Sequence, residues 1–241
     1  MKNLYVIKSD PNPGRDLYSE VAGIRYARLP VTTPIVKIGD SFEDFVENYV
    51  APFIQKGDVV CISAKVVSIC KAFVVHESEV KISLLARIIV KFVKKWPGDI
   101  GYSHPRKMQV AIMQTGYPRM ILALLGGTFM KLLGKPGYFY RIAGHNINAI
   151  DGFNPVSKPP MNEYAVLPPV NGDEICNDLQ QKYSVPFVIL DGNNIDNNIL
   201  GMSDGAKSLY SVEKFMEIVK GNPQGQEDDG QVTPVLIVRK V

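Results

Sequence analysis

Three loops of the sequence concentrate carboxylate and amide oxygens. The first covers residues 148–154 and holds Asp151 and Asn154, the second begins at Asp191 directly after an apolar run, and the third covers residues 225–230. Such oxygens are hard ligands that suit Mg²⁺ or Mn²⁺, and these ions commonly share phosphate oxygens with the protein. Asn, Asp and Gly also form ordinary turns. Each loop taken singly therefore indicates either a metal and phosphate site or a simple turn.

Other familiar chemistries find no support in the sequence. It contains no G-x-G-x-x-G, P-loop, H-E-x-x-H or G-x-S-x-G motif, which argues against the common nucleotide and hydrolase folds. Cys61, Cys70 and Cys176 are widely spaced and odd in number, so neither a zinc site nor a disulfide framework is indicated. Free thiols fit a reducing compartment, and charges interrupt the first apolar run, so we expect a cytoplasmic protein.

Length and composition indicate an ordered globular protein. The chain has 241 residues, of which 46% are hydrophobic and 21% charged, with a net charge of +3. These values predict one large domain or two small ones and exclude disorder as the global state. The small net charge gives no electrostatic reason to expect a nucleic acid as a partner.

A mixed set of strands and helices must position the three loops. Continuous apolar and β-branched residues predict a buried strand over residues 59–67, with residues 69–75 continuing the sheet. Residues 191–204 are predicted to form one 14-residue polar loop. The other predicted elements are strands at 164–167, 186–190 and 233–238, and helices at 42–54, 174–183 and 212–219. Because strict βαβ repetition is missing, we expect an α+β fold of mixed sheets with packed helices.

Two apolar helices, at residues 82–96 and 119–133, admit two interpretations. Basic residues in the first, including Arg87 and Lys91, and the short apolar run of the second exclude a membrane span, so a membrane is not an expected partner. Apolar residues recur at three- and four-residue steps in the first helix, which favours a face toward the core. The alternative is a surface that binds a membrane or a protein partner.

Several segments, taken in order, resemble the coenzyme F420-0:L-glutamate ligase family. Residues 148–154 are similar to its N-A-(G)-I-D-x-S-N signature, and Asp191 followed by Ser203-Asp204 is similar to its metal-binding Asp and later T-D pair. The other matching segments are residues 33–40, 57–68 and 225–239. The ordered set reaches from about residue 29 to the C-terminus. Uncharacterised bacterial relatives of the ligase resemble this chain further at residues 132–137 and 159–164.

The resemblance implies an unusual α+β fold that forms an intertwined homodimer. It implies a GTP-dependent ligase that joins an amino acid such as L-glutamate to a small carboxylate through an acyl phosphate, supported by two divalent ions, Mg²⁺ or Mn²⁺. We expect residues 1–241 to form one ligase-like unit, with a subdivision into 1–165 and 166–241 as the alternative.

The resemblance also assigns site residues. Asp151, Asp191 and Gln226 would be metal ligands, and we predict catalytic roles for Lys65, Asp151 and Asp191. The implied nucleotide-binding residues are Thr33, Pro34, Ile35, Val36, Ala64, Lys65, Asn154, Gln224, Gly225, Gln226, Glu227, Asp228, Asp229, Gly230 and Gln231.

Two departures from the family pattern bear on catalysis. The phosphate-contacting Lys of the family falls on Ile69, and the Thr ligand after the second metal-binding Asp falls on Gly192. Lys65 lies four residues before Ile69, and in the strand expected here both side chains share one face. We therefore predict that Lys65 supplies the missing charge. The departures leave a second hypothesis, a degenerate protein that binds a nucleotide or metal without turnover, and a third, the interaction module noted above.

Overall fold

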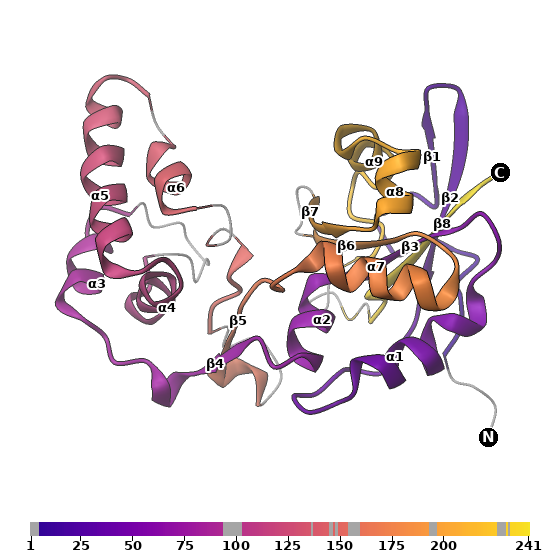
Figure 1. The fold of residues 1–241 in the computed structure, drawn as a ribbon, viewed down its shortest axis with the longest axis horizontal. Coiled ribbons are helices and arrows are strands. Elements are labelled where there is room, and N and C mark those ends of the chain that lie inside the picture. The colour runs from indigo at the N-terminus through magenta and orange to yellow at the C-terminus, as the bar shows by residue number, and fades with distance from the viewer. Residues whose placement is uncertain are drawn as a thin grey trace. The chain divides into compact units, whose positions relative to one another are not determined.

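The computed structural model describes residues 5–93, 103–135, 137–144, 147, 149–153, 160–192, 197–225, 230 and 232–241. The chain forms two compact units: Met1–Ala72 with Pro169–Val241 make unit 1, and Phe73–Pro168 make unit 2 (Figure 1). The chain thus leaves unit 1 once and returns to it. The alternative subdivision after residue 165 lies close to the return point, whereas no sequence signal indicated the departure after Ala72.

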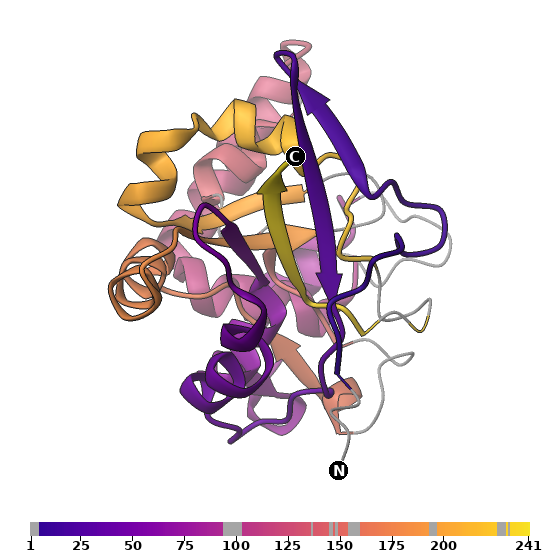
Figure 2. The ribbon, with the colours of Figure 1, turned by 90° about the vertical axis from the view of Figure 1, so that its right-hand side faces the viewer.

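Unit 1 is built on a six-stranded mixed sheet. The strand order is β1-β2-β8-β3-β6-β7, where β3 and β6 are parallel and the other pairs are antiparallel. The bounds are β1 Tyr18–Val21, β2 Ile24–Val31, β3 Val59–Ser63, β6 Phe187–Gly192, β7 Asn197–Met202 and β8 Val235–Lys240. Figure 2 shows β8 beside β2. The central strands β3, β6 and β8 are almost wholly buried, as their apolar sequences require.

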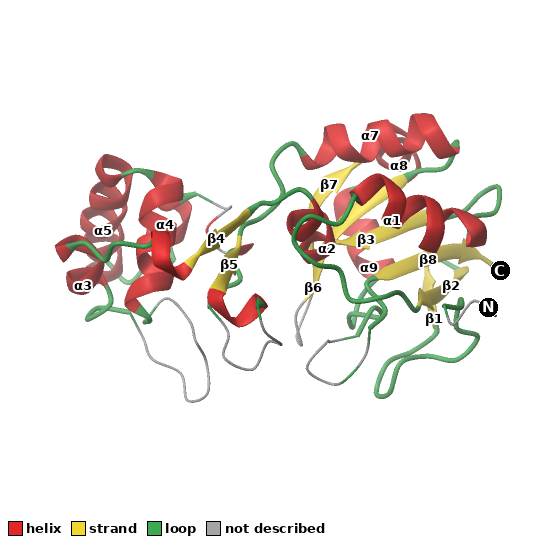
Figure 3. Ribbon diagram, turned by 90° about the horizontal axis from the view of Figure 1, so that it is seen from below, coloured by secondary structure: helices red, strands yellow, loops and turns green. Residues whose placement is uncertain are grey.

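Short helices cover this sheet. Helix α7 packs against β6 and β7, α9 against β1 and β7, and α2 against β3 and β6 (Figure 3). The bounds are α1 Phe42–Tyr49, η1 Ala51–Phe53, α2 Ala64–Cys70, α7 Gly172–Tyr183, α8 Asp204–Leu209 and α9 Val212–Ile218. Ser41, Ser203 and Ser211 cap α1, α8 and α9 by accepting a backbone N–H bond, which satisfies a donor that the first turn leaves open.

Two sequence predictions in unit 1 are wrong. The predicted strand 59–67 ends at Ser63, and residues 64–70 form α2 instead of continuing the sheet. The neighbouring strand β8 begins at Val235, opposite Ile62, so beyond Ser63 that side of β3 has no paired strand. Packing of α2 on the sheet then outweighs the β propensity of its Val and Ile residues. The predicted loop 191–204 contains β7, which pairs with the end of β6.

Unit 2 is mainly helical and includes a two-stranded sheet. Strands β4 Val74–His76 and β5 Tyr164–Val166 are antiparallel. The helices are η2 Glu77–Glu79, α3 Leu84–Ile89, α4 Pro105–Thr115, α5 Tyr117–Leu132, α6 Tyr138–Ala143 and η4 Met161–Glu163. Helix α6 approaches α5 so closely that a Cβ on Gly127 would lie 2.8 Å from the Cα of Phe139. The helix predicted over residues 82–96 is shorter, and its last residues lie outside the described part of the chain.

Candidate functional site

One edge of the unit 1 sheet brings together residues that are far apart in sequence. Strands β2, β3 and β6 end at this edge, and β8 begins there, because Val31 pairs with Val235, Val235 with Ile62, and Ile62 with Ile189. These paired residues form a row across the sheet. Thr33, Ala64 and Asp191 each follow a residue of this row by two positions, and Thr233 precedes Val235 by two. Parallel strands present their carboxyl ends at one edge, which is where ligands of mixed sheets commonly bind. The edge thus gathers three predicted site residues.

A buried asparagine fixes the loop that borders this edge. Asn12 is 1% exposed, and its Nδ2 donates to the carbonyls of Pro223 and Gln224 at 3.0 Å each and to Thr233 Oγ1 at 2.9 Å. Gln224 Nε2 donates to the carbonyl of Pro234 at 2.6 Å. The predicted nucleotide residue Gln224 therefore has a structural role in holding the loop before β8. The sequence analysis missed Asn12, because its partners lie more than 200 positions away.

Lys65, which we predicted to supply a positive charge from a strand, lies on helix α2. Lys65 is half-buried on the first turn of α2, and Ile69, one turn later, is 3% exposed. Residues four apart share a face in a helix as well as in a strand. The expectation that Lys65 and Ile69 lie on one face therefore holds for a different reason. A buried Ile69 fits a packing position between the helix and the sheet.

Gly192 adjoins two buried amide oxygens. A Cβ built on Gly192 would lie 2.7 Å from Asn197 Oδ1 and 2.8 Å from Asn222 Oδ1. The amide groups are held in place because Asn197 Nδ2 donates to the carbonyl of Val219 at 2.6 Å and Asn222 Nδ2 to that of Gly225 at 3.2 Å. We call this place, bordered by Gly192, Asn197 and Asn222, the amide cradle. Amide oxygens suit Mg²⁺ or Mn²⁺, but Gly192 is paired with Asn197 whereas Asp191 is paired with Asn198, so the Asp191 side chain lies on the other face of β6 from the cradle.

A surface hollow lies beside the segment predicted to contact the nucleotide. It measures about 370 Å³ and is lined on one side by residues 34–37, which include Pro34, Ile35 and Val36. Helix α1 lines the other side with Asp44, Phe45, Asn48 and Tyr49, spaced along one face. Polar groups beside aromatic rings are the chemistry of a site for a planar, hydrogen-bonding ligand.

Most of the other predicted site residues belong to unit 2 or lie outside the described part of the chain. Asp151 belongs to unit 2, where its backbone exchanges two hydrogen bonds with Val166, at 2.9 and 2.8 Å. Asn154, Gln226, Glu227, Asp228, Asp229 and Gln231 lie outside the described residues, and Gly230 is exposed. Across the described part of the chain, no three His, Cys, Asp or Glu side chains cluster as a metal site.

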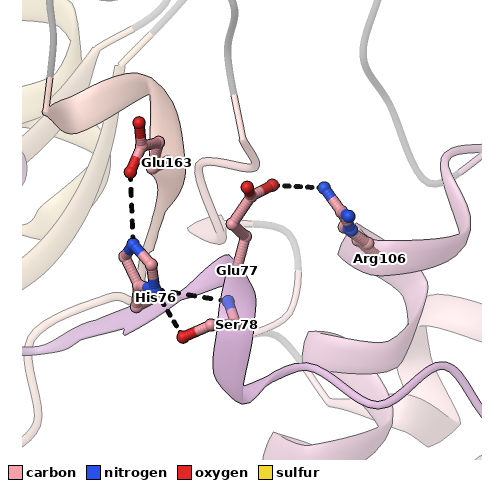
Figure 4. Close-up of polar contacts among 5 residues, drawn as sticks. All are labelled: His76, Glu77, Ser78, Arg106 and Glu163. Carbon is pink, nitrogen blue, oxygen red and sulfur yellow. Dashed lines mark hydrogen bonds and ion pairs between the residues drawn. The ribbon is translucent and has the colours of Figure 1, made fainter.

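Unit 2 holds a second polar cluster around His76 (Figure 4). The backbone N–H of Ser78 donates to His76 Nδ1 at 3.3 Å and the Ser78 hydroxyl lies 2.7 Å from it, while His76 Nε2 lies 3.3 Å from Glu163 Oε2. With Nδ1 accepting, Nε2 carries the proton and donates to the carboxylate. Arg106 pairs with Glu77 alongside. These contacts cap η2 and join it to η4 and α4, which is a structural role.

The three cysteines are free and not activated as nucleophiles. Burial raises the pKa of the Cys61 thiol well above its ordinary value, and it raises the pKa of Cys176 to about 12. Burial and the neighbouring Asp40 carboxylate raise the pKa of Cys70 to about 11. Because the thiolate is the reactive form, these values argue against covalent catalysis by cysteine.

Comparison with known proteins bears on the same residues. A family model described as F420-0:Gamma-glutamyl ligase matches residues 30–186, which is more than half of the chain. The match includes residues 33–36, Ala64, Lys65 and Asp151, and it ends before Asp191 and the amide cradle. No curated protein matches the chain. In the described residues, no helix combines the length and apolar character needed to cross a membrane.

Proposed function

The chain belongs to the F420-0:gamma-glutamyl ligase family, and from this premise we propose that it is a GTP-dependent amide ligase. The family indicates a ligase, and the proposal adds the nucleotide, the metal and the acyl phosphate. The observation that carries it is the sheet edge of unit 1, where Thr33, Ala64 and Asp191 stand at one level although they are distant in sequence.

The proposed reaction has two steps. A carboxylate oxygen of the acceptor attacks the γ-phosphorus of GTP, and the bond to the β-phosphate oxygen breaks, which gives an acyl phosphate and GDP. The amine of an amino acid such as L-glutamate then attacks the carbonyl carbon. The new C–N bond replaces the C–O bond to phosphate, and the amine loses a proton. Lys65 would stabilise the negative charge on the transferred phosphoryl group.

We place the nucleoside in the hollow beside α1 and its phosphates toward the sheet edge. The support is that residues 34–36 line the hollow and follow directly on Thr33, which stands at the edge. The Asp44 carboxylate can accept the two adjacent N–H groups of a guanine edge. On this contact and on the resemblance we propose GTP as the nucleotide.

We assign a divalent ion to the Asp191 carboxylate, as the resemblance implies. A bound Mg²⁺ or Mn²⁺ would supply positive charge opposite the phosphate oxygens. The amide groups of Asn197 and Asn222 are held by backbone carbonyls, so the cradle on the other face of β6 would keep the end of this strand, and with it Asp191, in place. Their oxygens lie where a side chain on Gly192 would begin. The ligand roles of Asp151 and Gln226 rest on the sequence resemblance, as does the homodimer.

One observation favours an alternative without turnover. Ile69, which replaces the phosphate-contacting Lys of the resemblance, is buried and cannot donate a hydrogen bond. If Lys65 does not replace that charge, the chain would bind nucleotide and metal but transfer no phosphoryl group. Nucleotide binding and phosphate release therefore have to be measured separately.

A thermal titration with GTP or ATP, each with and without Mn²⁺, tests the proposal. A ligand at 100 times its Kd stabilises the folded protein by about 2.7 kcal/mol, which corresponds to a rise in Tm of roughly 5–10 °C. We expect a metal-dependent rise that is larger for GTP and is lost in Asp191→Asn. The matched control is Asp178→Asn, an exposed change on α7.

Phosphate release in the presence of glutamate and a carboxylate acceptor then separates the two functions. We expect phosphate release by the wild type. In Lys65→Ala the rate should fall at least about a hundredfold, since the positive charge that stabilises the transferred phosphoryl group is removed. Metal-dependent GTP binding without phosphate release would favour the alternative. No response to either nucleotide would overturn both.

A further inference from the structure

We propose that the outer face of α5 in unit 2 docks onto an anionic lipid surface. The helix is apolar on two opposite faces. Its inner face packs into the core of unit 2 through Met120, Ala123 and Gly127. Its outer side chains, which we call the outer α5 face, are exposed: Ile121 44%, Leu122 60%, Leu125 64%, Phe129 62% and Leu132 82%.

The spacing makes this a continuous stripe. At 100° per residue, the five exposed side chains fall within about one third of the helix circumference, and the three buried ones lie opposite. Most of the large apolar side chains that the described structure leaves exposed lie between residues 84 and 133. They include Leu84 and Phe92, which are 74% and 69% exposed in and just after α3. Both α3 and α5 lie at the same end of unit 2 in Figure 1 and Figure 3.

The charge of this segment identifies the partner. Residues 81–150 contain eleven Lys and Arg but a single acidic residue, so the segment carries +10 while the rest of the chain carries −7. Lys131 and Lys135 are exposed at the end of α5, and neither forms an ion pair with a residue that the structure describes. An apolar stripe with exposed lysines at its end, in a basic segment, is a pattern typical of a helix that lies in the interface of an anionic membrane.

A second copy of the chain is a poorer occupant of the same face. A two-fold contact places like patches together, and two segments of +10 would repel each other. The homodimer that the resemblance implies would therefore use another surface of the chain. Helix α5 is too short to span a membrane, because it has 16 residues and a span needs about 20. The helix would lie along the surface and leave unit 2 folded.

Vesicle co-sedimentation of the full chain tests the proposal. We expect binding to phosphatidylcholine vesicles containing 30 mol% phosphatidylserine, at least about tenfold stronger than to pure phosphatidylcholine and weakened by 0.5 M salt. Leu125→Glu with Phe129→Glu should lower binding by more than about tenfold, because charges replace the apolar contact. Both side chains are more than 60% exposed, so the variant should keep its Tm.

The control variant carries the same kind of substitution in unit 1. Leu209→Glu with Val212→Glu changes two exposed apolar side chains of unit 1 and should leave vesicle binding intact. Absence of binding to anionic vesicles would overturn the proposal. So would a wild-type dimer in sedimentation equilibrium that dissociates on Leu125→Glu with Phe129→Glu, since a second copy would then cover the face. Nucleotide response in unit 1 is measured separately, so failure of the ligase proposal remains distinguishable.

Discussion

Replacement of Gly192 by alanine tests the amide cradle by the sign of its effect on stability. Gly192 is not among the described glycines with positive φ, so alanine is compatible with its backbone. In open space, Gly→Ala stabilises a protein by about 0.4–1 kcal/mol, because the unfolded chain loses freedom. If no atoms lay beside Gly192, Gly192→Ala would therefore raise the Tm.

The geometry predicts the opposite result. The new Cβ would lie 2.7 and 2.8 Å from two buried amide oxygens, whereas ordinary contact begins at 3.4 Å. Neither Asn197 nor Asn222 can move without stretching its bond to a backbone carbonyl. Overpacking of this kind costs about 1–3 kcal/mol. After the gain from the unfolded state is subtracted, we expect a net loss of about 1–2 kcal/mol, or a fall in Tm of roughly 2–8 °C.

Thermal unfolding of Gly192→Ala, Asn222→Ala and the double variant measures this contact. In the Asn222→Ala background the crowding oxygen is gone, so the cost of Gly192→Ala should fall by at least about 0.5 kcal/mol, which exceeds ordinary non-additivity. A rise in Tm for Gly192→Ala, or strict additivity in the cycle, would refute the cradle geometry. Mn²⁺ titration of the same variants then shows whether the cradle affects binding of the ion assigned to Asp191.

Three further predictions concern unit 1. Asp58→Asn should lower the free energy of unfolding by about 3 kcal/mol in a denaturant titration, because the 1% exposed carboxylate accepts from Arg239 Nε and Nη2 at 2.7 and 2.8 Å; a change below about 1 kcal/mol would contradict this. Asn12→Ala should weaken GTP binding at least about threefold by freeing the loop at residues 222–225, whereas unchanged affinity would separate that loop from the nucleotide. The pKa of Cys70 is about 11, against an ordinary value of 9.0, so its thiolate fraction at pH 8 is about a hundredfold lower than that of a free thiol. Labelling of the native protein by iodoacetamide should therefore be slow and should become about tenfold faster per pH unit. Fast labelling at pH 7 would argue against burial of Cys70.

The sequence by itself determined the strongly patterned elements and the family. The predicted strands at 59–67, 186–190 and 233–238 overlap β3, β6 and β8, and the predicted helices at 42–54, 174–183 and 212–219 overlap α1, α7 and α9, because apolar runs, caps and turn residues are local signals. The α+β class followed from their order and is confirmed. The position of Asp191 at the end of an apolar strand was also readable from the sequence. So was the family, through motifs that occur in the right order.

Tertiary structure alone decided where the chain stops being sheet and which residues meet. The pairing of β8 with β3 determines that Lys65 stands on a helix, although the local residues favour a strand. Asn12, Asn197 and Asn222 became visible only through contacts with distant segments. The exposure of the outer α5 face was likewise undecided, since an apolar helix has the same sequence pattern whether its second face is covered or not. In each case the outcome depends on a non-local partner, and local periodicity carries no information about it.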